Sequence, residues 1–436
     1  MWTSRRSLLA AAAAAAGLPA DLWAGAFNRR RVARPYLDLA LRAARWIEAS
    51  RQETEHGVRY PADPLKPESV GLDFYNGMPG VVAFYAALHR ASEDPTWFAA
   101  AEAGGRYLLH AVATEGDKLD GGLYTGLAGI SYSLNCLNRG KPNTKWGDEA
   151  RRLIDPVGVR ALTTDSWDII SGLAGTGLFL LSAGSLDLAT KAGHRLIAAG
   201  EPAEGGTMWF PAGSVRRNYP NFSHGTAGVA YFLASLYRAT KEPAFLDAAL
   251  KGAAYLEAVA TTRDGTTRIF HQSGGGEDRY YLSWCHGPVG TARLFYRLSQ
   301  ITGEPRWSAW IDSLTRGVFD SGVPEQRTTG YWNNVGQCCG NVGIGQYGID
   351  LARYRQPNAN PAFQRRIVDD TLRRATSEGA GIRWAQAENR TQPENVVAQT
   401  GFMQGAAGIG TFLLQLDALE QGTRWALPFP DTPFVG

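Results

Sequence analysis

Ser223-His224-Gly225-Thr226-Ala227-Gly228 is the stretch that decides the fold of this chain. A glycine, two residues and a second glycine open an apolar segment in which Val229, Phe232 and Leu233 recur at helical spacing. The same arrangement, called here the glycine motif, occurs seven times, with 46 to 65 residues between successive first glycines. In chain order its glycines are Gly77 and Gly80, Gly126 and Gly129, Gly172 and Gly175, Gly225 and Gly228, Gly287 and Gly290, Gly340 and Gly343, and Gly405 and Gly408. One such pattern means little, but seven copies at similar spacing indicate structural repeats.

Each repeat is predicted to be a pair of helices. The segment after Gly228 is apolar almost all round, which is typical of a buried inner helix. Lys241-Glu242-Pro243 then interrupts the pattern, and a second helix follows. Glu93-Asp94-Pro95 and Gly303-Glu304-Pro305 interrupt the first and fifth repeats in the same way.

Helical hairpins of this kind either stack as an open array or close into a ring. An open array needs atypical polar repeats at its ends. The first and last motifs here carry the same glycines as the others, so the pattern favours an all-α (α/α)7 toroid of seven hairpins in two layers. We expect one domain over residues 36–427, although 436 residues would allow two or three. The first glycine would allow a tight turn, and the second would allow the inner helices to converge.

The first residues have the order of an export signal. Arg5-Arg6 precedes the apolar stretch Leu8–Ala16, and Ala24-Gly25-Ala26 offers a cleavage point. Residues 1–26 therefore predict a twin-arginine-type signal peptide and an exported, periplasmic protein; the alternative is a disordered alanine-rich tail. No other stretch is apolar enough to span a membrane after signal removal. A net charge of +3 with scattered basic residues gives no footprint for nucleic acid.

Cysteines concentrate beside the glycine motifs. The chain has four, and Cys285, Cys338 and Cys339 all lie one or two places before a first glycine. If the motifs are equivalent, these three meet at one end of the ring. Three thiolates with an open fourth position are typical of a catalytic zinc site, and soft sulfur ligands select zinc over magnesium or calcium. The prediction is a Zn²⁺ ion on these three residues.

Two alternatives to zinc remain open at this point. Cys338 and Cys339 could form a vicinal disulfide, or all three cysteines could be buried free thiols that pack as small hydrophobes. The fourth, Cys136, lies in an apolar stretch away from any glycine motif and is expected to serve packing.

Four short motifs together resemble the lanthionine synthetase C-like family over about residues 36–427. They are Asp168-Ile-Ile-Ser-Gly172, Ser223-His224-Gly225, Trp284-Cys285-His286-Gly287 and Cys338-Cys339-Gly340. The resemblance implies a toroid with a central zinc that adds a peptide cysteine thiol to dehydroalanine or dehydrobutyrine, which forms a thioether. His224 matches the family's acid/base histidine, and Asp168 matches an aspartate that takes the thiol proton or orients a partner. As alternatives, Asp168 could cap a helix and His224 could simply be packed.

The chain departs from the family pattern at two positions. Cys339 stands where many members have a zinc-binding histidine, so the predicted site has three thiolates and resembles a more reactive branch of the family. Tyr281 stands where an arginine is expected, four residues before Cys285, and Arg279 is the nearest candidate to substitute for it. The second departure puts full cyclase activity in doubt.

Three functions from different classes are therefore considered. The first is a zinc-dependent thioether-forming enzyme acting on a peptide or another thiol-containing substrate. The second is a zinc-stabilised toroid that binds peptides or partners without catalysis. The third is a glycan hydrolase in which Asp168 serves as one carboxylate and Trp284 and Trp332 stack on sugars, but it lacks a marked second acid.

Overall fold

The computed structural model describes residues 33–210, 217–326, 334–387, 396–423 and 428–434. The chain divides into two compact units, Met1–Pro35 and Tyr36–Gly436. The predicted signal peptide, residues 1–26, lies outside the described residues. The second unit continues to Gly436, past residue 427 where the sequence predicted the domain to end.

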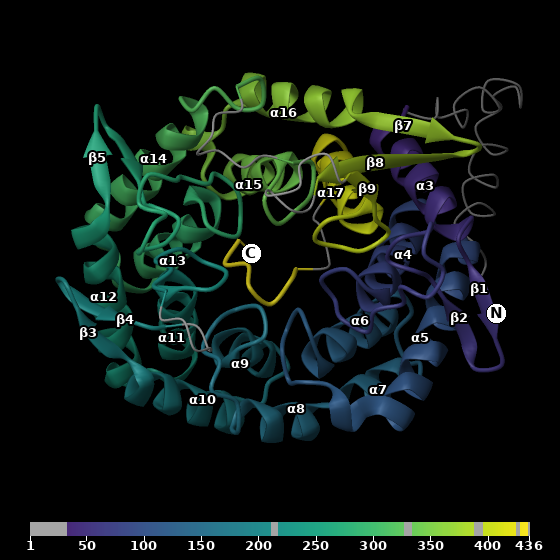
Figure 1. Cartoon of the computed structure of the whole chain (residues 1–436), viewed down its shortest axis with the longest axis horizontal. Coiled ribbons are helices and arrows are strands. Elements are labelled where there is room, and N and C mark those ends of the chain that lie inside the picture. Colours follow the sequence, from purple (N-terminus) through teal and green to yellow (C-terminus); the bar gives the residue numbers. More distant parts are fainter. Residues whose placement is uncertain (1–32, 211–216, 327–333, 388–395, 424–427, 435–436) are drawn as a thin grey trace, which may run out of the picture. The chain divides into compact units, whose positions relative to one another are not determined.

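The helices of the second unit form two concentric layers, so the predicted (α/α)7 toroid is confirmed (Figure 1). Each inner helix begins directly after the first glycine of a motif. The inner helices are α4 (Met78–Ser92), α6 (Leu127–Gly140), α9 (Leu173–Ser182), α11 (Thr226–Thr240), α13 (Pro288–Thr302), α15 (Asn341–Tyr354) and α17 (Ala406–Glu420). The outer layer contains α3 (Pro35–Glu48), α5 (Pro95–Glu115), the pair α7 (Trp146–Arg152) and α8 (Ile154–Ala161), α10 (Leu186–Ala199), α12 (Pro243–Val259), α14 (Pro305–Phe319) and α16 (Pro361–Arg373). Two short 3-10 turns, Gly116–Lys118 and Gln356–Asn358, join helices of the ring.

A closed circle of backbone hydrogen bonds joins the seven turns that precede the inner helices, and we call it the hub ring. In six motifs the residue two places before the first glycine both donates to one neighbour and accepts from the other. In motif 3 the carbonyl of Ile170 accepts while the N–H of the preceding residue, Ile169, donates. The seven N–H···O bonds are Tyr75 to Tyr124 (3.0 Å), Tyr124 to Ile170 (3.0 Å), Ile169 to Ser223 (3.0 Å), Ser223 to Cys285 (2.8 Å), Cys285 to Cys338 (3.1 Å), Cys338 to Met403 (3.1 Å) and Met403 to Tyr75 (2.8 Å). The last bond closes the ring and confirms that the motifs are structurally equivalent.

The glycines are required by close backbone approach. Gly225 has an extended φ of −135°, which any residue can adopt. A Cβ atom there, however, would lie 1.7 Å from the carbonyl oxygen of Tyr219 in its own turn. A Cβ atom at Gly408, a second glycine, would lie 1.7 Å from the carbonyl oxygen of Phe402. Both separations are far below van der Waals contact, so the motif requires glycine at these positions.

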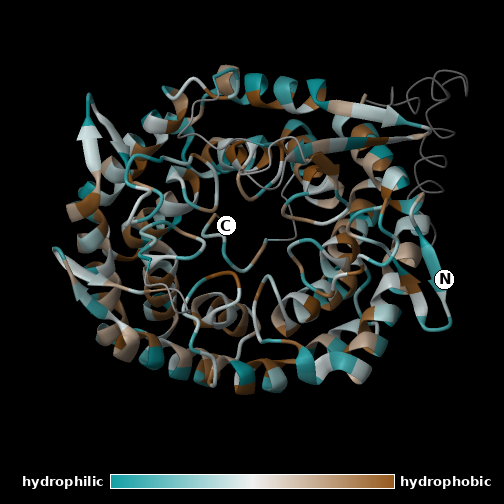
Figure 2. Cartoon of the chain, viewed as in Figure 1, coloured by the Kyte–Doolittle hydropathy of each residue, from teal (hydrophilic) through white to brown (hydrophobic). Residues whose placement is uncertain are grey.

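The apolar core lies between the two layers (Figure 2). The inner helix α11 is buried over its first three turns, from Thr226 to Leu236. The outer helix α12 buries one face, which includes Phe245, Ala249 and Leu256. This difference between a helix apolar all round and an amphipathic helix is the pattern that the sequence predicted for the two layers.

Short β-hairpins follow several outer helices, and the sequence-based prediction missed them. They are β1 (Gln52–Thr54) with β2 (Gly57–Arg59), β3 (Glu201–Ala203) with β4 (Gly206–Met208), β5 (Thr261–Arg263) with β6 (Thr266–Arg268), and β7 (Ala375–Glu378) with β8 (Gly381–Ala387) and β9 (Val396–Ala398). Seven of these nine strands have three residues, which is too short to show alternation; β7 has four and β8 has seven. The turn Asp264-Gly265, with φ values of 51° and 75°, was the available signal.

Two further features are the character of the helices and the path of the C-terminal segment. Among the described residues, no helix is both long and apolar enough to cross a bilayer. The C-terminal segment, residues 428–434, turns into the interior of the ring of inner helices (Figure 1).

Candidate metal centre

The structure brings Cys285, Cys338 and Cys339 together at the hub ring. Their sulfur atoms all lie within 4.8 Å of one another. The Sγ of Cys339 is 3.1 Å from that of Cys285 and 3.4 Å from that of Cys338. Tetrahedral zinc with bonds of about 2.3 Å separates its sulfur ligands by about 3.8 Å. The three side chains therefore fit a zinc ion after shifts of a few tenths of an ångström.

Hydrogen bonds to Cys338 prepare it to carry the negative charge of the cluster. Donation from Cys285 and Cys339, with a further contribution from Tyr75 and the charge of His224, holds the pKa of Cys338 well below its ordinary value. Burial raises the pKa of Cys285. Tyr75 in turn accepts a hydrogen bond of 3.0 Å from Nε2 of Gln404. Gln404, Tyr75 and Cys338 are thus linked by consecutive hydrogen bonds at the centre.

Geometry excludes one of the two alternatives to zinc, the vicinal disulfide. None of the four cysteines forms a disulfide bond, and the 3.4 Å between the Cys338 and Cys339 sulfurs is far longer than such a bond. Cys136 is 1% exposed on α6, and burial raises its pKa to about 12. It serves packing, as the sequence predicted.

Asp168, which is buried, and His224, which is partly exposed, form a pair at the same end of the ring. Oδ2 of Asp168 lies 2.6 Å from Nδ1 of His224. Oδ1 of Asp168 accepts from the backbone N–H of Ser171 at 2.9 Å and of Gly172 at 2.8 Å. Asp168 thus contacts both the turn before α9 and the histidine, which fits two of the three roles that the sequence left open. With both oxygens occupied, it is poorly placed to exchange protons with a substrate.

Burial and nearby negative charge have opposite effects on the pKa of His224. Burial alone would lower it, but the hydrogen bond and charge of Asp168, with the charge of Cys338, raise it above the ordinary value. An ionised Asp168 requires a proton on Nδ1, which leaves Nε2 as the nitrogen that can exchange protons. The side chain of His224 is 40% exposed, so solvent and substrate can reach it.

A wall of aromatic and imidazole rings continues from His224. The ring of His286 stacks on that of His224 with centroids 5.6 Å apart, and His271 lies 4.3 Å from His286. Tyr219 lies 5.2 Å from His286, and Tyr281 lies 4.4 Å from His271. The position where the family resemblance implied an arginine is thus occupied by a buried tyrosine in this wall. Arg279 belongs to the neighbouring loop, where its carbonyl accepts from the N–H of His271 at 2.8 Å.

Of the two tryptophans proposed for sugar stacking, the described one, Trp284, does not provide a platform. Trp284 is 4% exposed, and its indole N–H donates to Asp431 at 2.8 Å. Trp332 lies outside the described residues. The glycan hydrolase interpretation loses the contribution of Trp284, because a buried, hydrogen-bonded indole offers no open face.

Several site residues were missed by sequence reasoning. Tyr75 and Gln404 lie in the first and last motifs, and Tyr219 and His271 lie in the wall beside His224. The motif register contains a signal for three of them. Tyr75 stands two places before a first glycine, as Cys285 and Cys338 do, and Gln404 stands one place before, as Cys339 does. Tyr219 stands six places before its glycine, at the register position of Tyr281.

The fold and the site together define a class of protein: an α/α toroid whose inner-helix N-termini surround three clustered thiols and an Asp–His pair. The sequence profile of the family described as "Lanthionine synthetase C-like protein" matches residues 68–429, and the chain belongs to this family. A search of curated protein sequences found no match.

Solved structures share the fold at low sequence identity. Nisin cyclase matches with a TM-score of 0.64 and 17% identity, over 89% of this chain and 95% of that chain. A GH76A α-1,6-mannanase from Salegentibacter sp. HEL1_6 has a TM-score of 0.49 and 13% identity, over 88% and 99%. A sugar epimerase from a ruminal bacterium has a TM-score of 0.48 and 10% identity, over 89% and 98%. Of these three, nisin cyclase has a TM-score above 0.5, and its likeness supports the toroid fold.

Proposed function

We propose that this chain is a zinc-dependent cyclase that adds a cysteine thiol of a peptide to dehydroalanine or dehydrobutyrine and so forms a thioether. Zn²⁺ would be held by Cys285, Cys338 and Cys339. The observation that carries the proposal is that this thiol cluster and the Asp168–His224 pair lie on neighbouring turns of one ring. Membership of the lanthionine synthetase C-like family and the likeness to nisin cyclase support the same reaction class.

The chain's own residues account for the proton transfers. A zinc ion on the three sulfurs would bind the substrate thiol and keep it as a thiolate near neutral pH. Nε2 of His224 accepts the proton that the thiol gives up. The substrate sulfur then bonds to the β-carbon of the dehydro residue, and the electron pair of the double bond moves toward the neighbouring carbonyl as an enolate. His224 returns its proton to the α-carbon, so the reaction is an isomerisation with no net gain or loss of atoms.

Asp168 has the supporting role in this scheme. Its Oδ2 fixes the imidazole orientation and its charge raises the pKa of His224, so that the imidazolium is available as an acid. Tyr75, which accepts a hydrogen bond from Gln404, would stabilise negative charge on the Cys338 sulfur through its own hydrogen bond.

Metal content is the first test. Purified protein should contain about one zinc per chain, and Cys338→Ala should lose it because two thiolates hold zinc poorly. Cys136→Ala is the matched control, since Cys136 is buried on α6 away from the cluster and this variant should keep the metal. A metal-free wild-type protein would reject the proposed centre.

Catalysis is tested with a dehydrated peptide that carries one cysteine. Thioether formation leaves the mass unchanged, so residual free thiol is measured by alkylation and mass spectrometry. His224→Asn should slow thiol consumption by about 100-fold or more. His194→Asn is the control, because His194 pairs with Glu242 on the outer layer at 3.2 Å. Equal rates with and without the protein would exclude cyclisation of that peptide.

A second function, peptide binding without catalysis, is favoured by Tyr281. The tyrosine is buried against His271 where the family resemblance implied a positive charge. This alternative predicts zinc content and peptide binding with no loss of free thiol. Binding measured by anisotropy of a labelled dehydrated peptide, run beside the thiol assay, distinguishes the two functions.

We also propose that the protein is exported to the periplasm by a twin-arginine route, on the strength of residues 1–26 alone. Replacement of Arg5 and Arg6 by lysine should retain the protein in the cytoplasm. Fractionation of cells that express the two forms provides the measurement, and equal periplasmic amounts would contradict the proposal.

A further inference from the structure

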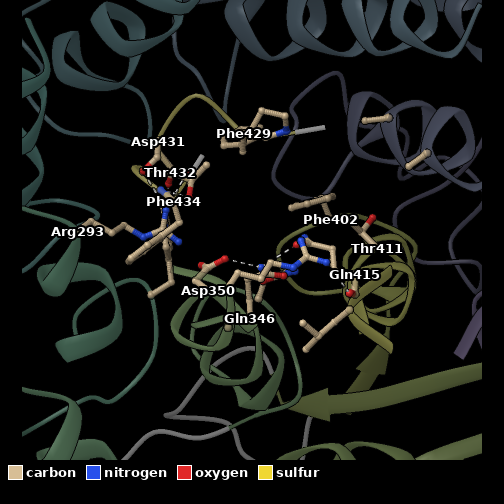
Figure 3. Close-up of a pocket in the computed structure, with 18 of the residues that line it drawn as sticks. Arg293, Gln346, Asp350, Phe402, Thr411, Gln415, Phe429, Asp431, Thr432 and Phe434 are labelled. Carbon is tan, nitrogen blue, oxygen red and sulfur yellow. Dashed lines mark hydrogen bonds and ion pairs between the residues drawn. The ribbon is translucent and has the colours of Figure 1, made fainter. Parts of the chain in front are cut away.

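The C-terminal segment, residues 428–434, enters a cavity of about 530 Å³ inside the ring of inner helices (Figure 3). Phe429, Asp431, Thr432 and Phe434 all line this cavity together with residues of the inner helices, among them Arg293. The sequence-based domain ended at residue 427 and gave this segment no role. Its contacts, however, are dense and specific.

Asp431 is the anchor of the segment. It is 2% exposed, and both carboxylate oxygens are engaged. Oδ2 accepts from the indole N–H of Trp284 at 2.8 Å and from the hydroxyl of Tyr124 at 3.0 Å. Oδ1 and the backbone carbonyl of Asp431 accept from the Arg293 guanidinium at 3.1 and 2.9 Å, as the orientation of these side chains in Figure 3 suggests. One carboxylate thus ties together groups from motif 2, motif 5 and helix α13.

Aromatic packing on either side holds Asp431 in place. The ring of Phe429 lies 4.8 Å from Phe74 and 4.9 Å from Tyr124, which belong to motifs 1 and 2. The ring of Phe434 lies 4.5 Å from Tyr296 on α13. The segment is therefore seated at three points, and the carboxylate has little freedom to move away from its donors.

Trp284 connects this anchor to the metal centre. It directly precedes Cys285 in the chain. The peptide of Cys285 is fixed in the hub ring, because its N–H donates to Cys338 at 3.1 Å and its carbonyl accepts from Ser223 at 2.8 Å. The backbone of Trp284 is also tightly enclosed, since a Cβ atom at Gly290 would lie 1.9 Å from its carbonyl oxygen. The backbone at Trp284 has no free space in which a displacement could be absorbed. A shift of Trp284 therefore moves Cys285 as well.

We infer that Asp431 is a positioning residue for the metal centre, which acts through Trp284 to set the place of Cys285 relative to Cys338 and Cys339. The inference rests on the zinc site proposed above. Metal affinity depends on ligand placement to a few tenths of an ångström, and residues that orient ligands from outside typically change metal affinity by 10- to 100-fold. The C-terminal segment is thereby a part of the metal site, although it supplies no ligand.

The test measures zinc affinity by competition with a chromogenic chelator, together with the visible absorption of the Co²⁺-loaded protein. Trp284→Phe keeps an aromatic side chain and the Arg293–Asp431 pair, removes the donor to Asp431 and gives up part of the packing on Tyr124 and Phe222. Asp431→Ala instead removes the acceptor of this hydrogen bond, and with it the carboxylate partner of Arg293. Both variants should weaken zinc binding by about tenfold and shift the Co²⁺ bands, because the ligand geometry changes. In the double variant the losses should not add, since both substitutions break one link.

Asp312→Ala is the matched control. Asp312 on the outer helix α14 pairs at 2.6 Å with Arg355, which follows the inner helix α15, so its loss should lower the melting temperature and leave zinc affinity and the Co²⁺ spectrum unchanged. Unchanged zinc affinity and spectrum in Trp284→Phe, together with a lower melting temperature, would show that the segment serves stability alone and would overturn the inference. Failure of the wild-type protein to bind zinc at all would instead reject the metal centre itself, which is a distinguishable result.

Discussion

At the scale of single residues, chemistry is decided by the one or two positions before each first glycine. The same backbone turn presents Asn76 in motif 1, His224 in motif 4 and Cys339 in motif 6. The hub ring supplies a constant scaffold, because its bonds use only backbone atoms. A reactive site can therefore be assembled there by side-chain substitution without a change in the fold.

The Asp168–His224 pair predicts a pH-dependent contribution to stability. The pKa of His224 is raised in the folded protein above its ordinary value of 6.5. A raised pKa stabilises the folded state fully below the unfolded value, and this contribution is lost as pH rises through the folded value. Asp168→Asn removes the charge that raises the pKa. The melting temperature should therefore fall more at about pH 5.5 than at about pH 8.5.

Differential scanning calorimetry of the wild type and Asp168→Asn at the two pH values measures this effect. In a His224→Gln background the same substitution should have a similar effect at both pH values, because the titrating partner is gone. A loss that is constant with pH, or that grows toward alkaline pH, would contradict the assignment of the pair.

At the scale of elements, the glycine motif acts as a joint between an incoming turn and an inner helix. The turn folds back so closely that its own carbonyl oxygens touch the helix backbone, as Gly225 and Gly408 illustrate. The joint therefore depends on contact distance. Any side chain at the joint would displace an inner helix from its neighbours in the ring.

Gly408→Ala should therefore be strongly destabilising. Its Cβ atom would lie 1.7 Å from the Phe402 carbonyl oxygen, so helix α17 must shift. We expect a loss of at least about 3 kcal/mol, within the range of severe packing defects. Gly116→Ala is the control, because its φ is −55° and the nearest atom to a new Cβ is Val112 Cγ1 at 3.5 Å. That change should stay within about 1 kcal/mol of the wild type. Urea denaturation gives both values, and similar stabilities would refute the close-approach argument.

At the scale of the whole molecule, closure removes the end repeats at which open arrays begin to unfold. Each inner helix of the unit packs against two others, and α17 packs against α4. The described parts of the unit share one continuous apolar core. The chain has the length of two or three domains, yet its contacts are those of one.

The unit should therefore unfold in one cooperative transition. Far-UV circular dichroism reports helices, and fluorescence reports the 13 tryptophans spread along the chain. The two urea curves should coincide. Two separated transitions, or a gradual loss of helix before fluorescence changes, would indicate that the ring behaves as an open array.

The repeat register was sufficient to predict the toroid and the meeting of Cys285, Cys338 and Cys339, because equivalent turns place equivalent positions at one end. The pairing of Asp168 with His224 was expected through the family resemblance and not from spacing. Contacts such as Tyr124 with Asp431, which are 307 residues apart, have no local signature. The C-terminal segment was missed for this reason, and the three-residue strands were missed because they are too short to show alternation.

The bond between Met403 and Tyr75 has a consequence for biosynthesis. It joins the last motif to the first, so the ring stays open while almost the whole chain is being translated. Contacts between such distant segments carry a high entropic cost of loop closure and form late in folding. Met403 is synthesised after the other six motifs, so the ring cannot close before all seven motifs have been made. A secretion pathway that accepts only folded cargo would have to wait for this closure.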